Sequence, residues 1–130
     1  HEDFTARVED ITSGKGVPVV FDGVGADTFE GSLKCLSPFG VFVSFGASLG
    51  KPPQLSVSVL AAKALYMTRP SLAPHTATAE LTKQIVSPLF QVIRDGLSIS
   101  ISQTYSLKDA ANAHRALESR KTTGSTILEI

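Results

Sequence analysis

Two short apolar runs, each closed by a turn that contains glycine, constrain the fold of this chain most strongly. The first run, residues 17–21, is followed by Asp22-Gly23-Val24-Gly25, and the second, residues 41–45, is followed by a turn that ends at Gly50. Both runs are apolar on both faces, which is typical of parallel strands covered by helices on either side. In such sheets a ligand binds outside the carboxyl ends of the strands, where glycine lets the backbone approach it closely. We therefore expect the two turns to line one binding crevice.

The residues around the first run have the pattern of helices. Periodic apolar positions predict a helix over residues 2–13. Asp27, with Glu30 three residues later, predicts the capped start of a second helix, and we expect Pro38 and Gly40 to end it. Strand, helix and strand within about thirty residues form a βαβ unit, whose right-handed crossover implies a parallel sheet.

The middle of the chain predicts three further elements. These are a short helix over residues 55–63, a third strand over residues 64–68 stopped by Pro70, and a helical segment over residues 76–96. We expect that segment to break at Ser87–Pro88, because proline lacks a backbone N–H and favours the first turn of a helix.

The stretch from residue 98 onward changes character. Residues 98–105 alternate apolar or long side chains with Ser and Thr, which predicts a half-exposed strand. A capping pattern at residues 106–109 opens a helix, and a final strand follows over residues 125–130. The side chains expected to face inward from the helix are Leu107, Ala110, His114 and Leu117.

Composition indicates one ordinary globular domain and excludes several classes of site. Twelve basic residues balance twelve acidic ones with no run of like charge, which argues against a nucleic-acid or membrane-surface partner. The longest apolar stretch is far shorter than a membrane span. The single cysteine, Cys35, excludes an internal disulfide and a cysteine-based zinc site, and it favours a reducing, cytoplasmic location. No metal ligands are predicted.

Five short segments of the chain resemble, in order and in spacing, the medium-chain quinone oxidoreductases. The segments are residues 19–25, 43–46, 68–70, 113–118 and 121–124. The family is the zinc-independent, zeta-crystallin-like branch of the medium-chain dehydrogenase/reductase superfamily. The resemblance covers essentially the whole chain and implies that the chain is the C-terminal part of a longer protein.

The resemblance implies an α/β fold with two parts. Residues 1–97 would form the second half of a doubly wound parallel sheet, a partial Rossmann fold that binds NADPH. Residues 98–130 would form a strand–helix–strand tail that in relatives packs on the GroES-like catalytic domain. The chain contains no G-x-G-x-x-G phosphate loop, so we expect that loop, and the residues that distinguish NADPH from NADH, to lie upstream of His1.

The resemblance also implies which residues contact NADPH in the intact protein. They are Ser44, Phe45, Gly46, Ala47, Asp22, Gly23, Val24, Met67, Thr68, Arg69 and Lys121. The end of a strand offers backbone N–H and C=O groups to the nicotinamide carboxamide, and Gly46 leaves room for it. Ala47 departs from the family, where Asn is frequent. Other interpretations stay open, namely a plain turn at residues 22–24, an edge-strand charge at Arg69 and a helix-end cation at Lys121.

The expected function is the transfer of reducing equivalents from NADPH to a quinone or another electron-poor acceptor such as an enone. The nicotinamide carries that chemistry, so no residue here is expected to act as acid, base or nucleophile. A 2-enoyl thioester reductase is the alternative within the superfamily. A second alternative is a non-catalytic dimerisation or binding module, because the edge strand from Ala64 to Arg69 predicts a homodimer. We expect the chain alone to bind NADPH weakly and to be inactive.

Overall fold

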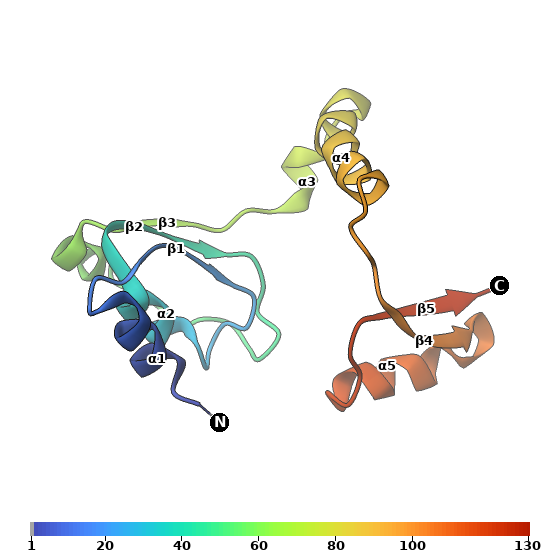
Figure 1. The fold of residues 1–130 in the computed structure, drawn as a ribbon, viewed down its shortest axis with the longest axis horizontal. Coiled ribbons are helices and arrows are strands. Elements are labelled where there is room, and N and C mark those ends of the chain that lie inside the picture. Colours follow the sequence, from blue (N-terminus) through green and yellow to red (C-terminus); the bar gives the residue numbers. More distant parts are fainter. Residues whose placement is uncertain (1) are drawn as a thin grey trace. The chain divides into compact units, whose positions relative to one another are not determined.

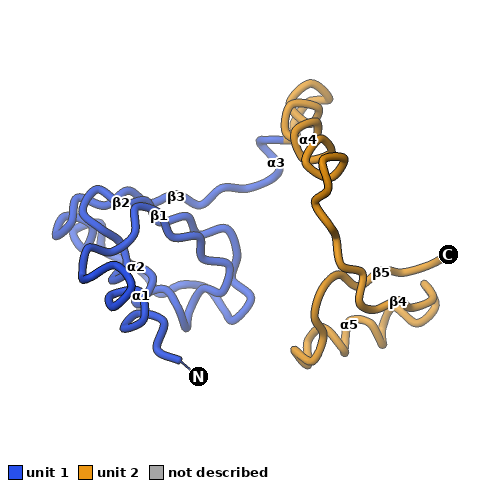
Figure 2. The backbone as a smooth tube through the Cα atoms, viewed as in Figure 1, with its two compact units in different colours: residues 1–75 blue, residues 76–130 orange. Residues whose placement is uncertain are grey.

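The computed structural model describes residues 2–130, which form two compact units (Figure 2). In residues 1–75 the elements are α1 (Phe4–Thr12), β1 (Val17–Asp22), α2 (Phe29–Cys35), β2 (Leu36–Ser44), the 3₁₀ helix η1 (Val57–Lys63), β3 (Tyr66–Thr68) and α3 (Leu72–His75). In residues 76–130 they are α4 (Ala79–Arg94), β4 (Ile101–Ser106), the 3₁₀ turn η2 (Leu107–Asp109), α5 (Ala110–Glu118) and β5 (Ser125–Glu129) (Figure 1).

The first unit contains a parallel sheet with the strand order β1-β2-β3. Phe21 of β1 is opposite Val43 of β2, and Phe42 of β2 is opposite Met67 of β3. The predicted parallel α/β fold is therefore confirmed, and β3 lies at an edge of this sheet. Because all three strands run in the same direction, their carboxyl ends lie along one edge of the sheet.

The core of the first unit lies on one face of the sheet. Phe42 is 0% exposed and packs edge-on against Phe29 of α2, with ring centroids 5.3 Å apart. Leu33 and Leu36 complete the buried cluster. On the opposite face Phe21 remains 71% exposed. Within residues 2–75, α1 and α2 lie on the same side of the sheet (Figure 1), so a helical cover of the other face stays a prediction.

The boundaries of α2 differ from the prediction at both ends. Thr28, not Asp27, precedes the helix, and its hydroxyl donates to the Asp22 carboxylate instead of capping α2. The helix ends at Cys35, and β2 already begins at Leu36 and runs through Pro38 and Gly40. The ladder accommodates these residues with a register irregularity opposite residues 17–19. Proline and glycine here mark a bulge in a strand and not the end of a helix.

A lysine from η1 completes the carboxyl end of α2. The Lys63 ammonium donates to the carbonyl oxygens of Lys34, at 2.8 Å, and Leu36, at 2.6 Å. The last carbonyls of a helix have no partner within the helix, and a cation there also interacts favourably with the helix dipole. Lys63 therefore joins the η1 segment to the junction between α2 and β2.

In the second unit α4 is continuous and does not break at Pro88, contrary to the prediction. Proline removes one helical hydrogen bond, but its fixed φ is compatible with helix, so a long helix can continue through it. The helix begins after Thr78, whose Oγ1 accepts from the Leu81 N–H at 3.2 Å. Gly96, with φ of +110°, ends the segment as expected. Within residues 2–130, no helix combines the length and apolar character that a membrane crossing requires.

The tail forms its own parallel pair, β4 with β5, connected through α5. Ala113 is the buried residue of α5, at 3% exposure, whereas Leu107, His114 and Leu117 are exposed. The predicted inward face is therefore wrong apart from the partly buried Ala110. Small alanine side chains let the helix approach a two-stranded sheet closely, which the larger side chains would prevent.

Candidate functional site

The turns that follow β1 and β2 lie side by side and are joined by backbone hydrogen bonds. The bonds run from Phe45 N–H to the Asp22 carbonyl at 3.0 Å, from Ser48 N–H to that of Gly23 at 3.1 Å, from Leu49 N–H to that of Val24 at 2.9 Å, and from Ala26 N–H to that of Gly50 at 3.1 Å. Residues 22–26 and 45–50 therefore form one structural element at the carboxyl edge of the sheet. The sequence predicts this juxtaposition correctly.

Glycine is required where the two turns touch. A Cβ on Gly46 would lie 2.7 Å from the Gly23 carbonyl oxygen and 3.0 Å from its Cα. Gly25 has φ of +94°, and a Cβ there would lie 2.2 Å from the Gly50 oxygen. These contacts involve backbone, which cannot move aside like the end of a flexible side chain. The turns can pack this closely only because these positions lack side chains.

The Asp22 side chain lies inside the first turn and is 4% exposed. Its Oδ1 accepts from the N–H groups of Val24, at 2.9 Å, and Gly25, at 3.0 Å. Its Oδ2 accepts from the hydroxyls of Thr28, at 2.8 Å, and Ser32, at 2.9 Å. Burial alone would raise the pKa of this carboxyl, but the hydrogen bonds from Gly25, Thr28, Val24 and Ser32 together lower the pKa below its ordinary value.

The ends of β2 and β3 are joined by an arginine. The Arg69 Nη1 donates to the Ser44 Oγ at 3.0 Å and to the Ser44 carbonyl at 3.4 Å. Both residues line a pocket of about 320 Å³ whose other walls are Phe29, Lys51, Pro52, Pro53, Leu55, Met67 and Thr68. Four of the predicted site residues, Ser44, Met67, Thr68 and Arg69, thus lie around one cavity.

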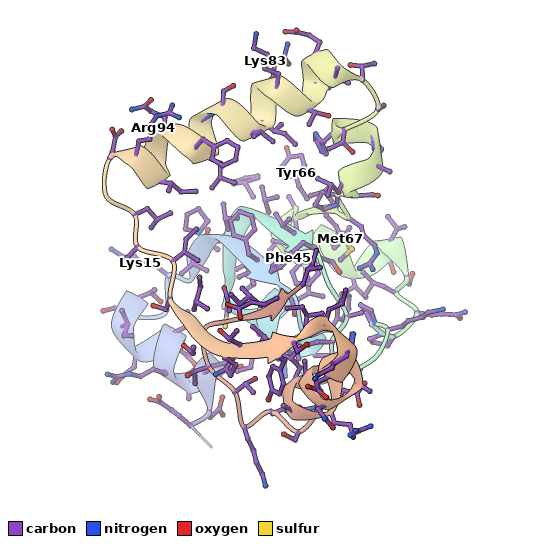
Figure 3. All side chains as sticks on the ribbon, turned by 90° about the vertical axis from the view of Figure 1, so that its right-hand side faces the viewer. Lys15, Phe45, Tyr66, Met67, Lys83 and Arg94 are labelled. Atoms are coloured by element: carbon purple, nitrogen blue, oxygen red, sulfur yellow. The ribbon has the colours of Figure 1, made fainter. Side chains whose placement is uncertain are left out.

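The tip of the second turn presents unused donors beside an aromatic ring. Within residues 2–130 no group accepts a hydrogen bond from the N–H of Gly46 or Ala47. Phe45 is 59% exposed, and Figure 3 labels its side chain at the end of β2, with Met67 on the neighbouring strand β3. A primary carboxamide requires backbone partners of this kind, and an aromatic ring suits a flat heterocycle. The residues present therefore fit the nicotinamide end of NADPH.

Two predicted and two unpredicted residues lie near Asp22. Gly23 and Val24 border a shallow hollow of about 130 Å³ near Asp22. Sequence reasoning missed Thr28 and Ser32, although two hydroxyl residues four apart at the start of a helix, directly after a strand that ends in Asp, were a usable signal.

Lys121 belongs to residues 76–130 and lies between α5 and β5. Its role at the cofactor stays a prediction. Among the residues that the structure describes, no group of three or more His, Cys, Asp or Glu side chains could hold a metal ion.

Comparison with known proteins gives a consistent family assignment. The family model for zinc-binding dehydrogenases matches residues 1–128. A quinone oxidoreductase from Pseudomonas aeruginosa is 43% identical over 130 residues, which cover 98% of this chain and 40% of that protein. A 2-haloacrylate reductase from a Burkholderia species is 35% identical, covering 98% of this chain and 39% of that protein.

Solved structures agree with the sequence matches. The crystal structure of Escherichia coli quinone oxidoreductase complexed with NADPH superposes with a TM-score of 0.93 and 43% identity, covering 100% of this chain and 41% of that one. NADPH is thus the cofactor bound in that structural relative. The chain spans about 40% of the length of the curated relatives it matches. The chain therefore belongs to the zinc-binding dehydrogenase family, with quinone oxidoreductases among its relatives.

Proposed function

We propose that this chain supplies the nicotinamide-facing part of the NADPH site in an oxidoreductase that reduces a quinone or a similar electron-poor acceptor. The observation that carries the proposal is the hydrogen-bonded pair of glycine turns at the carboxyl edge of the parallel sheet. The quinone oxidoreductases that match nearly the whole chain support a quinone as acceptor.

NADPH, when bound, supplies the hydride, and the residues of this chain orient it. The N–H groups of Gly46 and Ala47 donate to the carboxamide, while the exposed Phe45 ring limits the access of water. Arg69 holds the end of β2 through Ser44. No side chain of this chain serves as acid, base or nucleophile in this proposal.

The other predicted contact residues have indirect support. Gly23 and Val24 form a wall through their backbone, because the Asp22 carboxylate is already engaged within its own turn. Met67 and Thr68 line the pocket beside Ser44. Lys121 reaches the cofactor from the tail in this proposal.

We also propose that residues 1–97 form half of a nucleotide-binding domain and that residues 98–130 form a separate tail. The same proposal includes zinc-independent chemistry, a cytoplasmic location, and a homodimer formed through β3. The dimer is supported by the position of β3 at the edge of its sheet, where unpaired backbone groups can extend the ladder.

One alternative has a specific observation in its favour. The 35% identity with a 2-haloacrylate reductase favours an acceptor with an activated carbon–carbon double bond, as in a 2-enoyl thioester. Such an acceptor would use the same nicotinamide site. A non-catalytic dimerisation or binding module is the remaining alternative.

The test is NADPH oxidation by the intact protein, followed by the absorbance of the reduced nicotinamide. The acceptors are 1,4-benzoquinone, 2-chloroacrylate and crotonyl-CoA. We expect fastest turnover with the quinone, and loss of turnover in Gly46→Val because the new side chain would meet the Gly23 backbone. Gly14→Ala is the control, since a Cβ there meets nothing within 4 Å.

Faster turnover with 2-chloroacrylate or crotonyl-CoA would contradict the quinone as acceptor and favour an activated alkene. The absence of NADPH oxidation with all three acceptors would refute the enzymatic proposal. For the 130-residue chain alone, calorimetry is expected to show weak or undetectable NADPH binding, because the chain contains no G-x-G-x-x-G loop. Light scattering of the same sample tests the dimer, and a monomer at micromolar concentration would contradict it.

A further inference from the structure

We infer that Asp22 is a positioning residue for the cofactor-facing turn, residues 45–50, and that it acts through the two peptide planes that follow it. The inference rests on the proposed function and adds a residue whose side chain works from inside the fold. The carboxylate is buried, and within residues 2–130 its donors are neutral groups, such as the Val24 N–H and the Ser32 hydroxyl.

The peptide plane between Gly23 and Val24 lies between the carboxylate and the second turn. Its N–H donates to the Asp22 Oδ1 at 2.9 Å, and its carbonyl accepts from the Ser48 N–H at 3.1 Å. Because a peptide unit is rigid and planar, fixing the N–H also fixes the direction of the carbonyl. The carboxylate therefore determines where the Ser48 amide is held.

The next peptide plane repeats the arrangement. The Gly25 N–H donates to the same Oδ1 at 3.0 Å, while the Val24 carbonyl accepts from the Leu49 N–H at 2.9 Å. In each plane the N–H is thus bonded to the carboxylate, and the carbonyl is bonded to an N–H of the second turn. A charged acceptor also polarises the peptide unit, which strengthens the bond that its carbonyl accepts.

The consequence concerns the unused donors at the tip of the second turn. Gly46 and Ala47 lie between Phe45, which is bonded to the Asp22 carbonyl, and Ser48, which is bonded to the Gly23 carbonyl. Both ends of the tip are therefore fixed by the Asp22 turn. Without the carboxylate the two planes can rotate, and the tip loses its fixed position relative to the sheet.

Thr28, directly before α2, and Ser32, within α2, support the same arrangement. Their hydroxyls donate to Oδ2, so the carboxylate cannot rotate away from the backbone N–H groups without losing these bonds. Asparagine at position 22 can retain Oδ1 and both backbone bonds, and a hydroxyl can accept from its amide nitrogen. Alanine retains neither, so these two substitutions separate positioning from simple loss of charge.

The first measurement is amide hydrogen exchange in the 130-residue chain, which needs no cofactor. In Asp22→Ala we expect protection of the Ser48 and Leu49 amides to fall by about tenfold or more, while protection of the Phe42 amide changes less. Asp22→Asn should retain most of the protection. Asp27→Ala is the matched control, because Asp27 is an exposed carboxylate in the same turn.

Equal loss of protection at Phe42 and Leu49 would show general destabilisation and overturn the inference. Unchanged protection at Ser48 and Leu49 would overturn it as well. Neither result tests the proposed function, because the measurement involves neither NADPH nor an acceptor.

The second measurement is the KM for NADPH and the kcat of the intact protein. Asp22→Ala should raise the KM by about tenfold, a change of roughly 1.4 kcal/mol in binding, with Asp22→Asn near the wild type. Val20→Ala is a control for stability, since the Val20 side chain packs against the buried core cluster and makes no hydrogen bond to the turns. A similar rise in KM for Val20→Ala, or none for Asp22→Ala, would overturn the inference. If the wild type oxidises no NADPH, the proposed function fails. Hydrogen exchange alone then decides whether Asp22 positions residues 45–50.

Discussion

The contact between the two glycine turns leads to a quantitative prediction for Gly25→Ala. Gly25 has φ of +94°, and a Cβ would lie 2.2 Å from the Gly50 oxygen. That oxygen cannot easily retreat, because it accepts from the Ala26 N–H at 3.1 Å. Gly14 provides a matched comparison, since it also has a positive φ, +75°, but a Cβ there meets nothing within 4 Å.

The magnitude separates into two contributions. A positive φ costs an alanine roughly 1–2 kcal/mol, and restriction of the unfolded chain returns about 0.4–1 kcal/mol. Gly14→Ala should therefore reduce the free energy of unfolding by about 0–1.6 kcal/mol. Gly25→Ala adds overpacking against backbone, so its loss should exceed that of Gly14→Ala by about 1–3 kcal/mol.

The assay is urea unfolding followed by the intensities of amide NMR signals from residues 17–44. This choice reports on the first unit alone, because the chain forms two compact units that can unfold separately. The m-value of each variant is compared with that of the wild type. Where the two agree, a shift of the urea midpoint measures a change in the free energy of unfolding.

Equal losses for Gly25→Ala and Gly14→Ala would refute the reasoning. That result would mean that the close approach of residue 25 to residue 50 is not maintained in solution. The hydrogen-bonded pair of turns, and with it the proposed cofactor edge, would then lack its structural basis.

Three further predictions concern the first unit. Lys63→Met should lower the free energy of unfolding by about 1–3 kcal/mol in thermal denaturation, because two backbone carbonyls lose a charged donor. Lys34→Met should change it little, because the Lys34 side chain is exposed. Since the pKa of Asp22 is lowered in the fold, its contribution to stability is complete above the ordinary value of 3.8 and is lost as the pH falls through the lowered pKa. An acid titration of unfolding should therefore be flatter in Asp22→Asn, and an identical slope would contradict this. Phe42→Ala should cost about 3–5 kcal/mol in urea unfolding, and a loss below 1 kcal/mol would contradict its place in the core.

Much of the first unit follows from local pattern. The apolar runs at residues 17–21 and 41–45, with a helix between them, correctly predict parallel strands and adjacent turns. A third strand after residue 63 is also predicted from the sequence, and in the structure β3 pairs with β2 in parallel. These features depend on periodicity and chirality, which are properties of neighbouring residues.

The errors occur where the folded structure departs from the local preference of single residues. Thr28 looks like part of a capping pattern, but in the fold its hydroxyl binds Asp22, six residues earlier. Pro38 looks like a helix stop, yet Lys63 satisfies the helix end and β2 continues through the proline. Pro88 lies inside an unbroken helix.

The class of fold, the direction of the strands and the glycines that permit a close turn can all be predicted from the sequence. How the second turn is held beside the first, and how Lys63 meets the end of α2, became visible only in the folded structure. The reason is that hydrogen bonds such as Ser48 to Gly23, or Lys63 to Lys34, join groups that are 25 or more residues apart. No local pattern encodes such a bond, because its partners meet only after the sheet has formed.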